Sequence, residues 1–257
     1  MSPSRPGPGV SSVSVVVPVY NGAATITACI EALLAQTYPP HLTEIIVVDN
    51  NSTDGTPELI ARYPVTLLYE REIQTSYAAR NRGIVQARGE IIALTDADCA
   101  PRADWLEKLL EPFSDAAVGA VLGMVADHAA QSLTEEFTAM VKPFAHPERK
   151  GLKSLITGNV AIRCSALIEL GLFDELLPTA GDIDFGWRLQ RQTRFKVVDT
   201  PEACVLHRHR DSLSAVFGQF RRYGLSEVVL TTLYRGQAGS VTGSDEARRM
   251  ARQLRAL

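Results

Sequence analysis

Cysteine pairs and long apolar runs are missing from this sequence. Its four cysteines include no CxxC pair, which excludes the usual zinc and dithiol motifs and a dense disulfide framework. The longest nearly uncharged apolar stretch, residues 116–126, is far shorter than the roughly 20 residues of a membrane-spanning helix. We therefore expect no transmembrane segment and a reducing, cytoplasmic compartment.

Two common nucleotide-binding patterns are also absent. The sequence has neither the phosphate loop GxxxxGKS/T nor a GxGxxG turn after its first predicted strand, which excludes P-loop and dinucleotide-binding proteins. Basic residues are not interleaved with aromatic ones on one segment, so no nucleic acid partner is expected.

The composition is that of a globular protein. Apolar residues make up 46% and charged residues 21% of the 257 residues, enough for one large domain or two small ones. Residues 1–9 are rich in proline, serine and glycine and lack the apolar core of a signal peptide. We expect residues 1–12 to form a disordered lead-in.

Charge is unevenly distributed along the chain, although the net charge is only −3. From Arg208 onward there are nine arginines, no lysine and four acidic residues, a net charge of +5, which leaves −8 on the remainder. We expect residues 226–257 to form an arginine-rich helical tail. Such a tail could meet a phosphate or the inner surface of a membrane, or could be a solvated helical face.

Predicted strands and helices alternate along the chain. Strands are predicted at residues 13–19, 44–48, 65–69, 91–95, 118–125, 159–163 and 195–198. Helices are predicted after Gly22, with Ile26, Ile30, Leu33 and Leu34 on one face, after Thr56, and at residues 77–88, 133–144, 165–170, 182–192 and 212–223. Thr56 and Asp182 are expected to cap their helices. The alternation indicates an α/β fold with a doubly wound, mostly parallel central sheet and helices on both faces.

The last of these predicted helices is amphipathic. Its apolar residues Leu213, Val216, Phe217 and Phe220 are spaced for one helical face. This helix could cover an acceptor site, lie at a membrane interface, or pack on the body of the protein.

Polar residues gather where predicted strands end. Tyr20 and Asn21 follow the first strand, Asp49 the second, and Asp96 and Asp98 the fourth. Because open parallel sheets bind ligands beyond the carboxyl ends of their strands, a ligand site is predicted at this edge. The two acids of the DxD triplet could face one hard cation that phosphate oxygens also hold, or could be turn residues bonded to their own backbone. Asp49 could accept a hydrogen bond from a base or a ribose.

Four segments, in order, carry a family resemblance. They are VVPVYN (16–21), VVDNNSTDGT (47–56), ARNRG (79–83) and DAD (96–98). With Gly158, Asn159 and the region of Asp182, they make residues 13–225 resemble a family 2 glycosyltransferase of the GT-A fold. The resemblance implies inverting transfer of a sugar from a nucleotide-activated donor to an acceptor hydroxyl. It also implies a nucleotide-binding half at about residues 13–100 and an acceptor-side, catalytic half at about residues 101–225, with a smaller acceptor-side subregion beside the sheet.

The resemblance implies roles for single residues on the donor side. Asp49 would bind the uracil edge of a UDP-sugar, Arg80 would approach the base or the diphosphate, and Asp96 would hold the ribose. Asp98 would coordinate Mn²⁺ or Mg²⁺, which neutralises the leaving diphosphate. Three further donor-binding residues are implied: Pro18, Tyr20 (near the base) and Asn21.

On the acceptor side, the resemblance makes Asp182 the general base. Gly181 stands where this family commonly has glutamate, and Asp184 would orient the acceptor or serve the structure. His207 would complete the metal shell, with His209 as its competitor. The acceptor would be a carbohydrate, a lipid-linked molecule or another hydroxyl compound, and the QxxRW motif of processive synthases is absent.

Two other functions remain open from the sequence alone. A sugar nucleotidyltransferase also uses a doubly wound sheet with metal-binding acids, but it would have a glycine-rich basic loop after the first strand, where PVYNG stands. A catalytically silent nucleotide-sugar-binding scaffold is the other alternative, and it predicts the loss of one of the acids, all of which are present.

Overall fold

The computed structural model describes residues 11–141, 148–149, 151–210 and 212–235. Most of the expected lead-in, the end of the helix predicted at 133–144, and the arginine-rich tail beyond residue 235 lie outside the described residues. Ten strands are described: β1 (Val13–Val19), β2 (Thr43–Asp49), β3 (Thr66–Tyr69), β4 (Ile91–Thr95), β5 (Cys99–Pro101), β6 (Val118–Asp127), β7 (Glu148–Arg149), β8 (Leu152–Lys153), β9 (Asn159–Arg163) and β10 (Lys196–His207).

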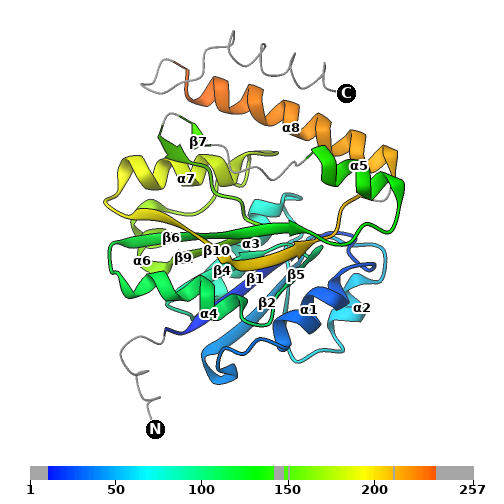
Figure 1. Ribbon diagram of the computed structural model, residues 1–257, viewed down its shortest axis with the longest axis horizontal. Helices are drawn as coiled ribbons and strands as arrows, with labels where there is room; N and C mark the ends of the chain where they lie inside the picture. Colours follow the sequence, from blue (N-terminus) through cyan, green and yellow to red (C-terminus); the bar gives the residue numbers. More distant parts are fainter. Residues whose placement is uncertain (1–10, 142–147, 150, 211, 236–257) are drawn as a thin grey trace.

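Eight of these strands form one sheet in the order β3-β2-β1-β4-β9-β6-β10-β5. Neighbours are parallel from β3 through β4 and between β6 and β10. β9 lies antiparallel between β4 and β6, and β5 pairs antiparallel with β10. The predicted α/β fold with a mostly parallel sheet is confirmed. The antiparallel β9 joins the two parallel parts into one sheet (Figure 1).

Helices cover both faces of this sheet. They are α1 (Ile26–Leu34), α2 (Thr56–Ile60), α3 (Ser76–Gln86), α4 (Trp105–Leu110), α5 (Leu133–Val141), α6 (Cys164–Leu170), α7 (Gly181–Gln192) and α8 (Leu213–Leu233), with 3₁₀ turns at Pro40–Leu42 and Glu111–Ser114. One core cluster joins the sheet to α1 and α4, and a second joins it to α3, α6 and α7. In the described part of the chain, no helix combines the length and the hydropathy that a membrane crossing needs.

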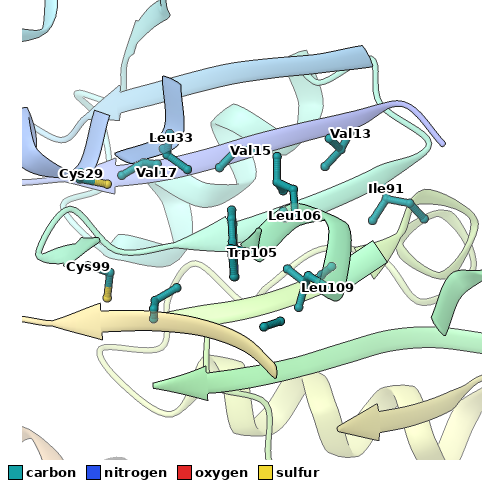
Figure 2. Close-up of a cluster of buried hydrophobic side chains, with 14 of the residues drawn as sticks. Val13, Val15, Val17, Cys29, Leu33, Ile91, Cys99, Trp105, Leu106 and Leu109 are labelled. Atoms are coloured by element: carbon teal, nitrogen blue, oxygen red, sulfur yellow. The ribbon is translucent and has the colours of Figure 1, made fainter. Parts of the chain in front are cut away.

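β1 shows why both faces are covered. All seven of its residues are buried. Because successive side chains of a strand point to opposite faces, Val13, Val15 and Val17 pack toward α1 and α4, while Val16 packs toward α3. Figure 2 shows the first cluster, with Trp105 and Leu106 of α4 against the β1 valines. The uncharged run in the sequence is therefore a strand buried on both sides.

Two elements extend well beyond their predicted ends. β10 is much longer than the strand predicted at residues 195–198. It pairs with β6 on both sides of an irregularity between Thr200 and Cys204, where the register shifts. α8 continues to Leu233 and so crosses residue 225, where the tail was expected to begin. Its N-cap is Ser212, whose hydroxyl accepts from the N–H of Ala215.

The N-caps of α2 and α7 lie one and two residues before the residues predicted to be the caps, Thr56 and Asp182. Gly55, with φ of 82°, is the N-cap of α2, and Thr56 is already helical. Ala180, with φ of 63°, is the N-cap of α7, so Asp182 lies within its first turn. Asp182 is therefore not the N-cap of α7.

Gly83 allows α3 to lie close against the sheet. A Cβ at this position would be 2.4 Å from Val16 Cγ1 and 3.1 Å from Val48 Cγ2. We expect Gly83→Ala to lower the free energy of unfolding by about 1–3 kcal/mol, because the helix must move away from β1 and β2. Chemical denaturation measures this change.

A matched control is Gly218→Ala on α8. There the nearest atom to the added Cβ is Arg222 Nη1, 3.8 Å away, so helix propensity alone should act and should favour alanine by up to about 1 kcal/mol. Equal effects of the two substitutions would contradict the packing argument.

Candidate functional site

The loops that follow β1 and β2 are bonded to each other. Asn21, in the left-handed region with φ of 49°, donates its N–H to Ser52 Oγ at 2.9 Å, and its Oδ1 accepts from Thr53 N at 2.8 Å. Pro18 is buried within β1, whereas the Tyr20 side chain is 55% exposed beside these loops. Asn21 thus shapes the edge of the site through the protein's own backbone, and Tyr20 is the side chain available to a ligand.

Asp49 ends β2 and is almost completely buried. Its Oδ2 accepts from Ser52 N at 3.2 Å. Its Oδ1 has no hydrogen-bond partner among the described residues. A buried carboxylate oxygen without a partner is costly, so this atom is suited to accept one N–H from a ligand.

Arg80 and Asp96 form a close ion pair. Arg80 is 3% exposed on α3, and its Nη2 lies 2.5 Å from Asp96 Oδ1 beyond the end of β4. A Cβ on Gly158 would come within 3.3 Å of Asp96 Oδ2, so this glycine leaves room for the carboxylate. The structure therefore brings together two residues that were each predicted to bind the nucleotide-sugar donor.

The other members of the ARNRG segment serve the structure. The Asn81 side chain donates to Phe173 O at 2.8 Å and to Glu175 Oε1 at 2.9 Å, and it accepts from Phe173 N at 3.1 Å. Asn81 thereby holds the segment before α7, and Gly83 sets the distance from α3 to the sheet. Of this motif, Arg80 is the residue whose side chain reaches the site.

Asp98 lies beside His207 and Arg210. Its Oδ2 is 3.5 Å from His207 Nε2 and 3.4 Å from Arg210 Nη2. Burial acts to raise the pKa of Asp98, but the hydrogen bond with His207 and the charge of Arg210 outweigh it and hold that pKa below its usual range. His209 is bonded instead to Asp127, with Nε2 2.8 Å from Oδ1. The contact of Arg210 with Asp98 was not predicted from the sequence.

An ionised carboxylate and an imidazole at one place fit a divalent cation. Within the described ranges, no group of three acidic, histidine or cysteine side chains could hold a metal ion. Asp98 and His207 would thus supply two ligands, and phosphate oxygens and water would supply the others, as they commonly do for hard divalent cations. The donor set fits a metal that is shared with a phosphorylated ligand.

Asp182 is held at the start of α7 by three hydrogen bonds. Its Oδ1 accepts from Tyr77 Oη at 3.3 Å and from Ile183 N at 3.0 Å, and its Oδ2 accepts from Thr157 N at 3.5 Å. Burial raises the pKa of Asp182, against the lowering effects of the Arg80 charge and of the two N–H groups. A carboxylate with a raised pKa is a stronger base, as proton abstraction requires.

Tyr77 explains the glycine at position 181. A Cβ there would come within 2.9–3.0 Å of the Tyr77 ring, so the ring occupies the space of a side chain at this position. Tyr77 was not singled out from the sequence. Its signal was its spacing: it precedes Arg80 by three residues and so lies on the same face of α3.

Asp184 faces away from the other site residues. Its Oδ1 accepts from Tyr234 Oη at 2.5 Å, and its Oδ2 lies 2.8 Å from Arg188 Nε. Arg188 lies one turn further along α7, whereas Tyr234 is the C-cap of α8. The structure thus places Asp184 in a buried link between two helices.

The architecture has known relatives. The model for "Glycosyl transferase family 2" matches residues 14–175, more than half of the chain. The chain belongs to glycosyl transferase family 2. The matched region of this family 2 chain includes Asp49, Arg80, Asp96 and Asp98, whereas Asp182 and His207 lie beyond it.

Two curated proteins illustrate the similarity. Glycosyltransferase AglE of Haloferax volcanii is 36% identical over 181 residues, which are 66% of this chain and 59% of that protein. The pre-mycofactocin glycosyltransferase of Mycobacterium tuberculosis is 26% identical over 236 residues, 87% of this chain and 48% of that protein. The family 2 chain thus spans about half the length of these relatives.

Solved structures share the fold. Mannosyltransferase PcManGT from Pyrobaculum calidifontis, in complex with GDP-Man and Mn²⁺, aligns with a TM-score of 0.67 at 24% identity, over 89% of this chain and 66% of its own. S. aureus TarS 1–349, in complex with UDP-GlcNAc, aligns with a TM-score of 0.63 at 19% identity, over 88% of this chain and 68% of the TarS chain. The predicted GT-A-type fold of this family 2 chain is confirmed.

Proposed function

We propose that this chain transfers a sugar from a nucleotide diphosphate donor to an acceptor hydroxyl, with inversion. One observation carries the proposal: Asp49, Asp96, Asp98 and His207 lie at or just beyond strand ends of one sheet. Asp49 keeps a buried oxygen without a partner, Asp96 is paired with Arg80 of α3, and Asp98 lies beside His207. Asp182 is close enough to Arg80 and Asp96 for their charges to act on it. Family membership supports the reaction class. The two solved relatives, which hold GDP-Man and UDP-GlcNAc, support a nucleotide sugar as the donor.

We propose a UDP-sugar as the donor. One oxygen of Asp49 is already bonded to Ser52 N, so a single oxygen remains for the base. The uracil ring has one N–H donor, which this oxygen satisfies. Guanine has two adjacent N–H donors on the corresponding edge and would bury one of them without an acceptor. Tyr20, exposed beside Asn21, would lie against the base, and the Arg80–Asp96 pair would face the ribose and the diphosphate.

Asp98 and His207 would hold the divalent metal. When bound, Mn²⁺ or Mg²⁺ would neutralise the charge that develops on the leaving diphosphate. The low pKa of Asp98 keeps its carboxylate ionised for this purpose. Mn²⁺ in the complex of PcManGT supports a divalent metal.

Asp182 would act as the general base. In an inverting transfer, the acceptor oxygen attacks the anomeric carbon from the side opposite the leaving diphosphate. Asp182 takes the proton of that oxygen as the bond forms. The Tyr77 hydroxyl and the Thr157 N–H hold the carboxylate in place. Asp184, which is bonded to Tyr234 and Arg188, would stabilise the α7–α8 contact.

Location and further partners are proposals as well. The four cysteines are all free thiols, which supports a reducing, cytoplasmic compartment. We propose a carbohydrate, lipid-linked or other hydroxyl acceptor, and peripheral contact of the arginine-rich tail with the inner face of the membrane. The tail beyond residue 235 lies outside the described residues.

A panel of nucleotide sugars tests the function. We expect sugar transfer or slow donor hydrolysis with Mn²⁺, and UDP should bind more tightly than GDP in calorimetry. Release of nucleoside diphosphate identifies a glycosyltransferase, whereas a nucleotidyltransferase forms or cleaves pyrophosphate. Binding without turnover would indicate the scaffold alternative. GDP bound tenfold more tightly than UDP, about 1.4 kcal/mol, would overturn the assignment of Asp49.

The raised pKa of Asp182 predicts a pH dependence. Asp182 accepts a proton only when it is ionised, so kcat/KM should fall on the acid side as its carboxyl becomes protonated. Because the pKa is raised, this fall should occur at higher pH than for an ordinary aspartate, near 3.9. A pH profile of kcat/KM measures it, and Asp182→Asn should remove this limb from the residual activity. An acid limb that is unchanged in Asp182→Asn would assign it to another group.

A further inference from the structure

α8 buries two of its polar residues and leaves several large apolar ones exposed. Its polar residues Gln219 and Ser226 are buried, and Ser226 bonds to Thr179 close to Asp182. Large apolar residues point the other way: Leu213 and Phe217 are each 73% exposed and Val228 is 60% exposed. A helix that only packed on the body would bury these residues and expose the polar ones. The apolar face predicted from the sequence is thus split, with Val216 buried and its neighbour Phe217 exposed.

α5 adds three more exposed apolar residues beside the start of α8. Leu133, Phe137 and Met140 lie on one helical face and are 85%, 41% and 75% exposed. Arg208, just before α8, lies 3.5 Å from the buried Glu135 and so ties the two helix starts together. In Figure 1, α8 forms the outermost layer on its side of the sheet, with α5 at one end of it.

These residues define the α5–α8 surface: Leu133, Phe137, Met140, Leu213, Phe217 and Val228. Its border is basic. Arg221 and Arg222 are exposed on α8, whose sequence from Leu213 to Leu233 contains these two arginines and one acid, Glu227. Glu136 is the exposed acid of α5. An apolar patch bordered by arginines matches a lipid surface with negative headgroups.

Two other occupants fit the charges less well. A second copy docked on this surface by twofold symmetry would bring the same arginines toward one another. The chain's own residues 236–257 contain four arginines and two acids and therefore carry the same sign of charge as the border. A bilayer with anionic lipids is complementary to both the apolar and the basic parts.

We propose that the α5–α8 surface docks on an anionic lipid bilayer, with Phe217 and Met140 among the headgroups and Arg221 and Arg222 facing lipid phosphates. α8 covers the acceptor side of the site through Ser226 and Tyr234. Docking would thus place that side next to the membrane surface. The proposal states where the chain acts and does not depend on which sugar it transfers.

Vesicle sedimentation of the full chain tests this proposal. We expect binding to vesicles that contain phosphatidylglycerol, little binding to phosphatidylcholine alone, and weaker binding at high salt. The double substitution Phe217→Glu with Met140→Glu should weaken binding about tenfold or more. Arg221→Gln with Arg222→Gln should weaken it about fivefold for each arginine. Ile168→Glu is the matched control, because Ile168 is 80% exposed on α6, outside the surface.

A second measurement separates this proposal from the proposed function. The increase in melting temperature with UDP and Mn²⁺ reports folding and nucleotide binding without a membrane, and it should be the same in all these variants. The proposal is overturned if the wild type shows no anionic preference at low salt while it still binds UDP. It is also overturned if Phe217→Glu with Met140→Glu binds vesicles like the wild type. The α5–α8 proposal is also overturned if changing Arg248, Arg249, Arg252 and Arg255 to Gln abolishes binding while all variants of the α5–α8 surface bind like the wild type, because the tail contact proposed above would then suffice alone.

Discussion

Replacing Asp182 by asparagine is expected to lower turnover by about 10²–10⁴-fold while donor binding stays nearly unchanged. A sugar hydroxyl has a pKa far above neutral, so it attacks slowly unless a carboxylate takes its proton. Asparagine keeps the size of the side chain, and its carbonyl oxygen can still accept from Tyr77 or Ile183. It has no basic oxygen, however. Steady-state kinetics and calorimetry with UDP separate the two effects.

Asp184→Asn is the matched control, because it makes the same chemical change two residues away. Asp184 is bonded to Tyr234 and Arg188, so its substitution should lower thermal stability more than turnover. A nearly normal turnover in Asp182→Asn together with an inactive Asp184→Asn would make Asp184 the base. The assignment of this segment would then be wrong by two residues.

Asp98→Ala is expected to reduce transfer to background, a loss on the order of 10³-fold or more. Asp98 is the carboxylate of the proposed metal site, and its substitution leaves His207 as the one remaining protein ligand. Excess EDTA should inactivate the wild type, and added Mn²⁺ or Mg²⁺ should restore it. Asp96→Ala should mainly weaken nucleotide binding, because Asp96 is paired with Arg80.

Asp127→Ala provides the comparison for Asp98→Ala. Asp127 also contacts a histidine, His209 at 2.8 Å, but that pair does not include Asp98. The variant should therefore keep the Mn²⁺-dependent increase in melting temperature with UDP, which Asp98→Ala should lose. Transfer by the wild type that persists in excess EDTA would rule out the metal-dependent mechanism.

Local sequence pattern determined the parallel arrangement of β3, β2, β1 and β4. The uncharged run of β1 has a side-chain period of two and no charge on either face, so it must be covered on both sides. Alternation with helices then makes its neighbours parallel, and parallel strands end at one edge. The placement of Asn21, Asp49 and Asp96 near that edge follows from these local rules.

Tertiary structure alone decided which of these groups meet. Asp182 contacts Tyr77 across 105 positions of sequence, and Asp184 contacts Tyr234 across 50. No periodicity encodes such pairs, because they depend on the angle and distance at which α3, α7 and α8 pack. For the same reason, the sequence predicted an apolar face on α8 but not which of its residues are buried. Residue types at strand ends thus led to the chemistry that we propose for the site, whereas the partners of Asp182, Asp184 and Asp98 were determined by packing between distant elements.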